Sequence, residues 1–190
     1  MTTQQARTSV ADLTTTRATD PGAITRGWAA RERRPLLGGD GRMLLVAADH
    51  PARGALGVRG DRLAMASRSD LLRRLATALS RPGVDGVLGT PDVLDDLLLM
   101  GALEGKVAIG SMNRGGLQGS AFELDDRFTG HTAAEIVARG IDGGGPPGGA
   151  MAGSRIVPLR PTGGAGRPPA ARLTSTEAVS PWRARSSSRT

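Results

Sequence analysis

The stretch that decides the fold runs from Met43 to Gly54 and reads Met-Leu-Leu-Val-Ala-Ala-Asp-His-Pro-Ala-Arg-Gly. Its first half is apolar without alternation, which is typical of a strand covered on both faces. The strand ends abruptly at Asp49 and His50. Parallel α/β enzymes place their chemistry at the carboxyl ends of such strands. We therefore expect an active site immediately after this strand.

The same pattern of a short apolar strand followed by an amphipathic helix continues downstream. We predict helices at 69–80, 91–103 and 132–139, and further strands at 84–89 and 106–112. Consecutive strands joined by helices favour a right-handed parallel βα succession. The expected fold class is therefore α/β, the N-terminal portion of a (β/α)8 TIM barrel. It is expected to be incomplete, because three units and a stub are fewer than the eight that close a barrel.

The two flanks differ in composition from the middle of the chain. Residues 1–24 are predicted to be a flexible arm, although a short helix carrying Trp28 is expected from 24 to 34. Residues 25–144 form the expected partial barrel. A fourth strand should begin at 141, but from 143 onward 9 of 48 residues are Gly and 7 are Pro. We expect residues 145–190 to be a disordered tail, translated out of frame, that does not continue the sheet.

Charge and composition limit the possible partners. Residues 1–142 carry 18 Lys and Arg against 17 Asp and Glu, so nearly all of the net charge of +7 lies in the final Arg-rich segment. Cysteine is absent, which fits a cytoplasmic location. No apolar run approaches the roughly 20 residues of a membrane helix, so no membrane partner is expected. Aromatic residues are too few to favour base stacking on nucleic acid.

Asp49 and His50 are the strongest candidates for catalysis. A carboxylate at a strand end can accept a proton, and an imidazole titrates near neutrality. The alternative is that Asp49 caps loop amides and His50 is a polar neighbour. Arg53 could hold an anionic substrate group through its planar guanidinium, or be a solvated loop residue.

Further polar residues follow the other predicted strands. Asn113 and Arg114 precede a glycine pair whose amides could approach an oxyanion, so we predict that they bind substrate. The alternative is that the glycine pair is a simple turn. Thr90 is explained by its position as a helix N-cap. His131 is predicted to lie at the surface. The only lysine, Lys106, is placed at the amino end of its strand, away from the expected site.

Several separate segments resemble one family of bacterial enzymes. They are the Leu44–Gly54 stretch and the sequences Gly86-Val-Leu-Gly-Thr-Pro-Asp92, Ser111-Met-Asn-Arg-Gly-Gly116, Phe122-Glu-Leu-Asp-Asp-Arg-Phe-Thr-Gly130 and Gly140-Ile-Asp-Gly-Gly144. Together they resemble the class I aldolase superfamily. It includes the deoxyribose-phosphate, fructose-bisphosphate and tagatose-bisphosphate aldolases, and a subgroup associated with inositol-catabolism genes.

The resemblance implies a (β/α)8 barrel that cleaves or forms a carbon–carbon bond in a small sugar or sugar phosphate through a lysine imine. Asp49 would assist proton transfer. No metal or other cofactor is expected. The family's imine lysine lies on the sixth strand and its phosphate site in the last two loops, so we expect this chain to be inactive alone. A sheet of three strands leaves exposed edges, so a further alternative is a homo-oligomer, or assembly with a complementary chain, that covers such an edge. The alternative function is a small basic protein whose Arg-rich tail binds nucleic acid or another polyanion.

Overall fold

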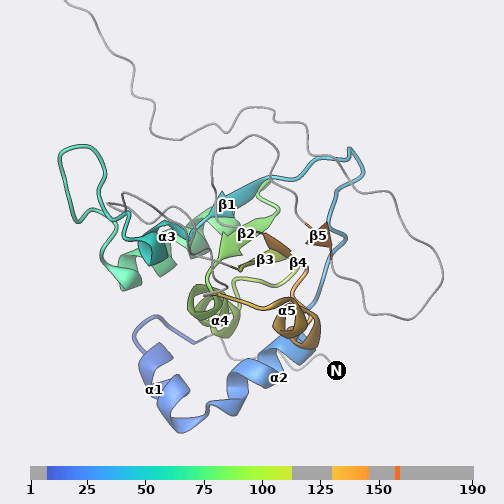
Figure 1. Cartoon of the computed structure of the whole chain (residues 1–190). Coiled ribbons are helices and arrows are strands. Elements are labelled where there is room, and N and C mark those ends of the chain that lie inside the picture. The colour runs from blue at the N-terminus through green and yellow to red at the C-terminus, as the bar shows by residue number, and fades with distance from the viewer. Residues whose placement is uncertain (1–7, 113–129, 146–156, 159–190) are drawn as a thin grey trace, which may run out of the picture.

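A computed structural model describes residues 8–112, 130–145 and 157–158 and shows helices packed on a five-stranded sheet (Figure 1). The strands are β1 (Leu45–Ala47), β2 (Gly86–Gly89), β3 (Val107–Ser111), β4 (Gly143–Gly145) and β5 (Val157–Pro158). They lie in the order β1-β2-β3-β4-β5; the first four are parallel, and β5 is antiparallel to β4. The α/β class and the parallel βα succession are therefore confirmed.

The helices are α1 (Leu13–Thr19), α2 (Gly22–Ala30), the short 3-10 helix η1 (His50–Arg53), α3 (Arg68–Leu79), α4 (Pro91–Leu99) and α5 (Ala133–Arg139). Four of the helices, α2 to α5, lie where the sequence predicts them, although α2 and α4 end about four residues earlier than expected; α1 and η1 were not predicted. The Ser67 hydroxyl caps α3 by accepting from the Asp70 amide at 3.3 Å. Thr132 and Glu135 form a capping box at the start of α5. Gly140 ends that helix in the left-handed conformation.

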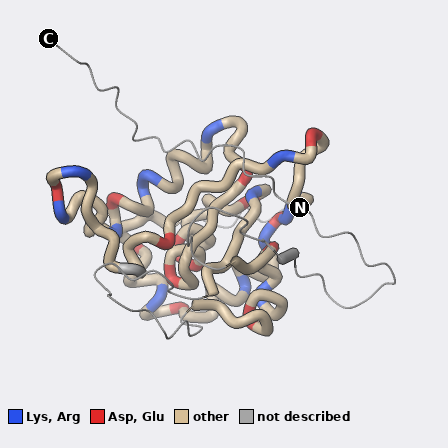
Figure 2. The backbone as a smooth tube through the Cα atoms, turned by 45° about the horizontal axis from the view of Figure 1, so that its top comes forward, with Lys and Arg blue, Asp and Glu red and all other residues tan. Residues whose placement is uncertain are grey.

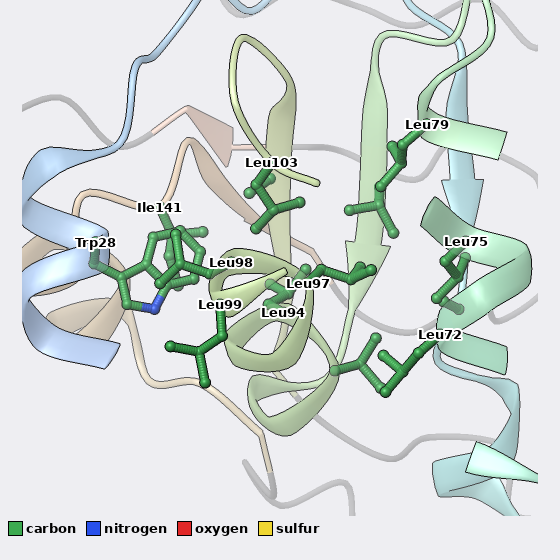
Figure 3. Packing of buried hydrophobic residues seen from close by; sticks show 14 of the residues in the cluster. Trp28, Leu72, Leu75, Leu79, Leu94, Leu97, Leu98, Leu99, Leu103 and Ile141 are labelled. Atoms are coloured by element: carbon green, nitrogen blue, oxygen red, sulfur yellow. The ribbon is translucent and has the colours of Figure 1, made fainter. Parts of the chain in front are cut away.

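One face of the parallel sheet carries the helices. Val46, Val87 and Ala108 are in register across β1–β3 and contact the same apolar cluster as the buried leucines of α3 and α4. Nearer the carboxyl ends, a side chain at Gly89 would meet α4, and one at Gly144 would meet α5. Figure 3 shows the α3 leucines at 72, 75 and 79 and the α4 leucines at 94 and 97 in this cluster. The helices of the βα units thus cover a single face.

A second layer of helices, α1 and α2, lies outside α4; the sequence predicts a helix around Trp28 but a flexible arm where α1 forms. Leu13 of α1 and Trp28 of α2 are buried in the main cluster, and Figure 3 shows Trp28 beside Leu98 and Ile141. The Trp28 indole donates to Asp95 Oδ1 at 2.7 Å. The prediction of a flexible arm for residues 1–24 is therefore wrong from Leu13 onward. Leu13 packs into the main cluster and stabilises α1, a tertiary contact that the local sequence pattern does not show.

The prediction that no fourth strand follows is also wrong. β4 pairs with β3 in the register Ile109–Gly143, Gly110–Gly144 and Ser111–Gly145. Unlike proline, glycine has a backbone N–H that can bond to a neighbouring strand. Because glycine has no side chain, it also fits where neighbouring side chains approach the strand closely. A Cβ on Gly144 would lie 2.6 Å from Ile136 Cδ1 and 2.7 Å from Met112 Sδ. Most of the tail lies outside the described residues, but Val157–Pro158 forms β5 and pairs antiparallel with β4. The prediction that the tail does not continue the sheet is therefore wrong for this segment.

β1 is not covered on both faces as its composition suggested. Leu45 and Val46 are half-buried and Ala47 is exposed. The reason is position, since β1 ends the order of strands and has a neighbour, β2, on one side among the described residues. In that part of the chain no helix is long and apolar enough to cross a membrane.

Candidate functional site

The candidate site begins where β1 ends. Ala48 continues the strand direction by donating to Leu88 O at 2.8 Å, and Asp49 then turns the chain into η1. Pro51 lies in the first turn of η1, where a missing backbone donor costs nothing. Gly54 ends η1 at φ +75°, a conformation that favours glycine. The local sequence therefore places Asp49 at the carboxyl end of the sheet.

Asp49 and His50 are brought together. The Asp49 side chain is 3% exposed, whereas that of His50 is 47% exposed. His50 Nδ1 lies 3.5 Å from Asp49 Oδ1, a separation at the outer limit of hydrogen bonding. A buried carboxylate thus stands behind a half-exposed imidazole. Such a pair can orient the ring and pass a proton between the sheet end and solvent.

The three predicted substrate-binding residues are tested less fully. The backbone of Arg53 forms the last residue of η1, close in sequence to the Asp49–His50 pair. The Arg53 side chain lies outside the described part of the structure, as do Asn113 and Arg114 entirely. Their roles stay predictions.

Thr90 follows β2 and has the structural role that the sequence suggested, with one difference. It occupies the N-cap position of α4, but its hydroxyl donates to Asp92 Oδ1 at 2.5 Å instead of accepting from a backbone amide. Burial opposes ionisation of Asp92, yet the Thr90 hydrogen bond and the Arg68 charge outweigh it and lower the pKa of Asp92. Thr90 is therefore engaged in organising the start of α4.

His131 is placed differently from the prediction of a surface residue. His131 is buried, with 1% of the residue exposed. Its ring lies against Gly110 of β3, so closely that a Cβ built on this glycine would be 2.7 Å from Nδ1. Its amide donates to Ser111 O at 2.9 Å. Neither ring nitrogen has a hydrogen-bond partner within the described residues. The sequence signal that could have indicated burial of His131 was Gly110, because a strand residue without a side chain leaves space for the imidazole on the helix-covered face.

Burial is the main cause of a lowered pKa for His131. The positive charge of Arg139 acts in the same direction, while Asp95 and Glu135 act against it. The neutral imidazole is therefore the favoured form. Because the ring lies on the helix-covered side of β3, His131 is not grouped with the Asp49–His50 pair.

The opposite ends of the strands hold a separate set of charged residues. Lys106 Nζ donates to Val84 O at 2.7 Å, so the lysine lies at the amino ends, as expected. The Asp142 carboxylate accepts from Arg31 at 2.7 Å and from Arg33 at 2.8 Å. It also accepts from the Ala108 amide at 2.9 Å. These contacts tie the segment after α2 to the sheet and serve stability.

A groove of about 510 Å³ lies between α1, α3 and α4. Its charged lining is paired, since Arg17 and Arg68 both bind Asp96, and Arg68 also binds Asp92. The pKa of Arg68 is raised: burial acts to lower it, but the hydrogen bond to Asp96 and the charges of Asp92 and Asp96 outweigh burial.

Among the described residues no three His, Asp or Glu side chains form a group that could hold a metal ion.

Residues 41–146 match the sequence profile of a family described as Cgl0159-like. The crystal structure of Cgl0159 from Corynebacterium glutamicum is similar, with 54% sequence identity and a TM-score of 0.67. The alignment covers 70% of this chain and 45% of the Cgl0159 chain. The chain therefore spans less than half the length of that solved relative. No functionally curated protein matches it.

Proposed function

From the premise that this chain belongs to the Cgl0159-like family, we propose that it supplies the first βα units of an aldolase-type lyase. The enzyme acts on a small sugar or sugar phosphate and cleaves or forms a carbon–carbon bond. Its architecture is a (β/α)8 barrel of which the described strands β1–β4 are a part. The observation that carries the proposal is the buried Asp49 carboxylate beside His50 at the carboxyl end of β1.

The order of strands supports the barrel. Parallel crossovers are almost always right-handed, so a sheet built in the strict order β1-β2-β3-β4 places every crossover helix on the same face. A doubly wound sheet reverses its order and carries helices on both faces. Here α3, α4 and α5 all pack on one face. Sequential order with single-sided helices is the arrangement that curls into a barrel.

The other face of the sheet is consistent with a barrel interior. Leu88 of β2 and Ile109 of β3 are in register and point away from the helices, and Ser111 follows on the same face. Branched apolar residues in this position are typical of the layers that fill a barrel. Ser111 is buried nearest the carboxyl end. The proposed substrate site lies above this layer, at the end where Asp49 stands.

In the proposed reaction Asp49 is the general base that accepts the proton of the substrate hydroxyl. During cleavage a carboxylate can accept the proton of the hydroxyl on the carbon that leaves as an aldehyde. The electron pair of the broken carbon–carbon bond would form the carbon–carbon double bond of an enamine, while the C=N pair moves to the imine nitrogen. Protonation of the enamine carbon and hydrolysis of the imine would then release the second product. His50, half exposed, would relay the proton to solvent.

The lysine that forms the imine is proposed to come from the part of the barrel beyond the matched region. Lys106 is the sole lysine of this sequence. Its amine donates to Val84 O at the amino ends of the strands, a full strand length from Asp49. This position supports the expectation that the chain alone forms no imine with a substrate carbonyl.

The test is a chimera in which residues 41–146 of this chain replace the matching part of Cgl0159. We expect it to cleave an aldol substrate and to be inactivated by borohydride in the presence of that substrate. Asp49→Asn should lower the cleavage rate by roughly 10²–10⁴-fold, the usual contribution of a positioned acid–base group. Lys106→Arg is the matched control and should leave the rate unchanged.

Two results would contradict the proposal. One is a chimera that folds but cleaves no aldol in a panel of sugars and sugar phosphates. The other is a borohydride adduct on Lys106, which would place the imine at the wrong end of the strands.

The second candidate, polyanion binding by the Arg-rich tail, gains no support from the described residues. Figure 2 shows Lys and Arg interspersed with Asp and Glu along the described backbone. Several of these arginines are paired with carboxylates, as Arg34 is with Asp85. The tail arginines lie outside the described part. If this candidate were right, binding would weaken steeply with salt and require residues 145–190.

A further inference from the structure

The segment between η1 and α3 folds back on itself as a short hairpin. Val58 and Asp61 exchange two backbone hydrogen bonds, at 2.8 and 3.2 Å, around a tight turn. Farther from the turn, the Met65 amide donates to Leu56 O at 2.9 Å. The hairpin, defined here as residues 56–65, projects from the molecule beside α3 (Figure 1).

The hairpin lies at the carboxyl ends of the strands, the end that carries the Asp49–His50 pair. It follows η1 closely and is joined to it by the Ala55 amide, which donates to His50 O at 3.2 Å. Loops at this end of a parallel sheet are where α/β proteins bind small molecules. The hairpin is therefore in a position suited to ligand binding.

A cavity of about 770 Å³ lies along the hairpin, a volume within the usual range of small-molecule sites. Its lining combines two cationic side chains with two leucines and two glycines: Arg59, Arg62, Leu56, Leu63, Gly54 and Gly57. Among the described residues no acidic side chain belongs to this lining. The neighbouring Asp61 carboxylate instead accepts from the Leu63 amide at 2.9 Å. The lining therefore carries a net positive charge.

Arg62 differs from the arginines that stabilise the fold. Arg17, Arg34 and Arg68 are each paired with an aspartate. Arg62 is exposed, and its guanidinium makes no ion pair or hydrogen bond within the described part of the chain. Its N–H donors are therefore available to an anion from solution.

The backbone at Arg59 has a conformation that glycine adopts more readily. Its φ is +55°, the only positive φ of a non-glycine residue in the described structure, whereas φ of the adjacent Gly60 is not positive. Strained backbone of this kind occurs preferentially at functional sites and ligand clamps. An arginine at this place in the turn favours a role for its side chain, because glycine would make the turn more easily.

We propose that the hairpin cavity binds a phosphate monoester, with the phosphate held by Arg59 and Arg62 and the carbon chain against Leu56 and Leu63. Planar guanidinium groups form paired, charge-assisted hydrogen bonds with phosphate oxygens. Two arginines match the nearly double negative charge of a phosphate monoester better than the single charge of a carboxylate. The phosphate belongs either to the substrate of the proposed lyase or to a separate ligand, and the site does not depend on that reaction.

The test is a calorimetric titration of the full 190-residue chain with glycerol phosphate, with glycerol as the uncharged control. We expect glycerol phosphate to bind and glycerol not to bind. The double variant Arg59→Gln/Arg62→Gln should weaken binding by about tenfold or more, as expected for lost charge-assisted hydrogen bonds. The proposal is wrong if the parent chain does not bind glycerol phosphate.

The matched control is Arg183→Gln/Arg185→Gln, which removes the same charge from the Arg-rich C-terminal segment. This variant should bind glycerol phosphate as the parent does. Equal weakening in both double variants would mean that overall positive charge attracts the phosphate, and would contradict a site at the hairpin.

Arg59→Gly separates binding from folding. Glycine tolerates the positive φ, so the variant should unfold at the same urea concentration as the parent or a higher one. It lacks the guanidinium and should bind glycerol phosphate about tenfold less tightly. Unchanged binding would exclude Arg59 from the site, and lower stability would show that its side chain serves the fold instead.

The chimera described above distinguishes the two sources of the phosphate, because residues 41–146 include the hairpin. If the phosphate is part of the substrate, Arg62→Gln should raise KM for a phosphorylated aldol and leave KM for its unphosphorylated counterpart unchanged. If neither KM changes while glycerol phosphate binding is lost, the ligand is a separate molecule. An inactive chimera would reject the lyase, whereas the binding result in the 190-residue chain would still decide the site.

Discussion

Asp49 and His131 are both buried near the carboxyl ends of strands, yet they serve different parts of the molecule. Asp49 follows β1 as the N-cap of η1, beside the half-exposed His50. His131 precedes α5, with its ring against Gly110 on the helix-covered face. A titratable group in the first position can take part in chemistry. In the second it mainly affects stability.

The pH dependence of stability should reveal His131. Its pKa in the folded chain is lowered from the ordinary value of 6.5, chiefly by burial. Its contribution to stability is therefore fully present above about pH 6.5 and is lost as the pH falls through the folded-state pKa. We expect the free energy of unfolding in urea to fall between pH 7 and pH 5, and His131→Leu to reduce that fall.

The titration can also be followed directly, because the sequence contains two histidines. The His131 ring proton resonance is identified by its disappearance in the variant. It should titrate below 6.5. An unchanged pH slope in His131→Leu would show that the buried ring is not responsible for the acid sensitivity.

At the scale of elements, β4 is the strand whose formation depends most on its surroundings. Three consecutive glycines have a weak intrinsic preference for a strand. Their register with β3 is supported by the Asp142 amide, which donates to Ala108 O at 3.0 Å, and by the Met112 amide, which donates to Gly145 O at 3.2 Å. The helix α5 and the Met112 side chain approach Gly144 so closely that a larger residue cannot be placed there without movement.

A methyl group at Gly144 should therefore be destabilising. Gly144→Ala would bring Cβ within 3 Å of Ile136 and Met112, and overpacking of this kind costs about 1–3 kcal/mol. Gly39→Ala is the matched control, since a Cβ there meets nothing within 4 Å. Urea unfolding of the two variants gives the comparison. Equal stability of both would mean that α5 is not packed on β4 as described.

At the scale of the whole molecule, three layers share one apolar cluster: the sheet, the helices α3–α5, and the outer pair α1 and α2. Trp28 is buried in it, its ring lies 5.3 Å from the Arg31 guanidinium carbon, and its indole is bonded to Asp95. Arg139 also binds Asp95, at 3.0 Å, so one buried carboxylate connects α2, α4 and α5. The outer layer is thus part of the same core.

We therefore expect one cooperative unfolding transition. With Trp182→Phe, Trp28 becomes the sole tryptophan and its fluorescence reports the docking of α2. Its urea transition should coincide with the loss of helical circular dichroism. If fluorescence changes at a lower urea concentration, α1 and α2 detach before the sheet unfolds, and the shared core is contradicted.

The amino-acid sequence by itself determined the βα succession from β1 to α5. Apolar runs, the Thr-Pro-Asp start of α4 and the glycine after α5 act over a few residues, so local pattern suffices to predict them. It also placed Asp49 at a strand end. Tertiary structure alone decided the rest: that β4 forms from glycines, that α1 joins the core and that His131 is buried. Each of these features depends on packing against residues that are distant in the sequence. A local sequence pattern does not encode such contacts.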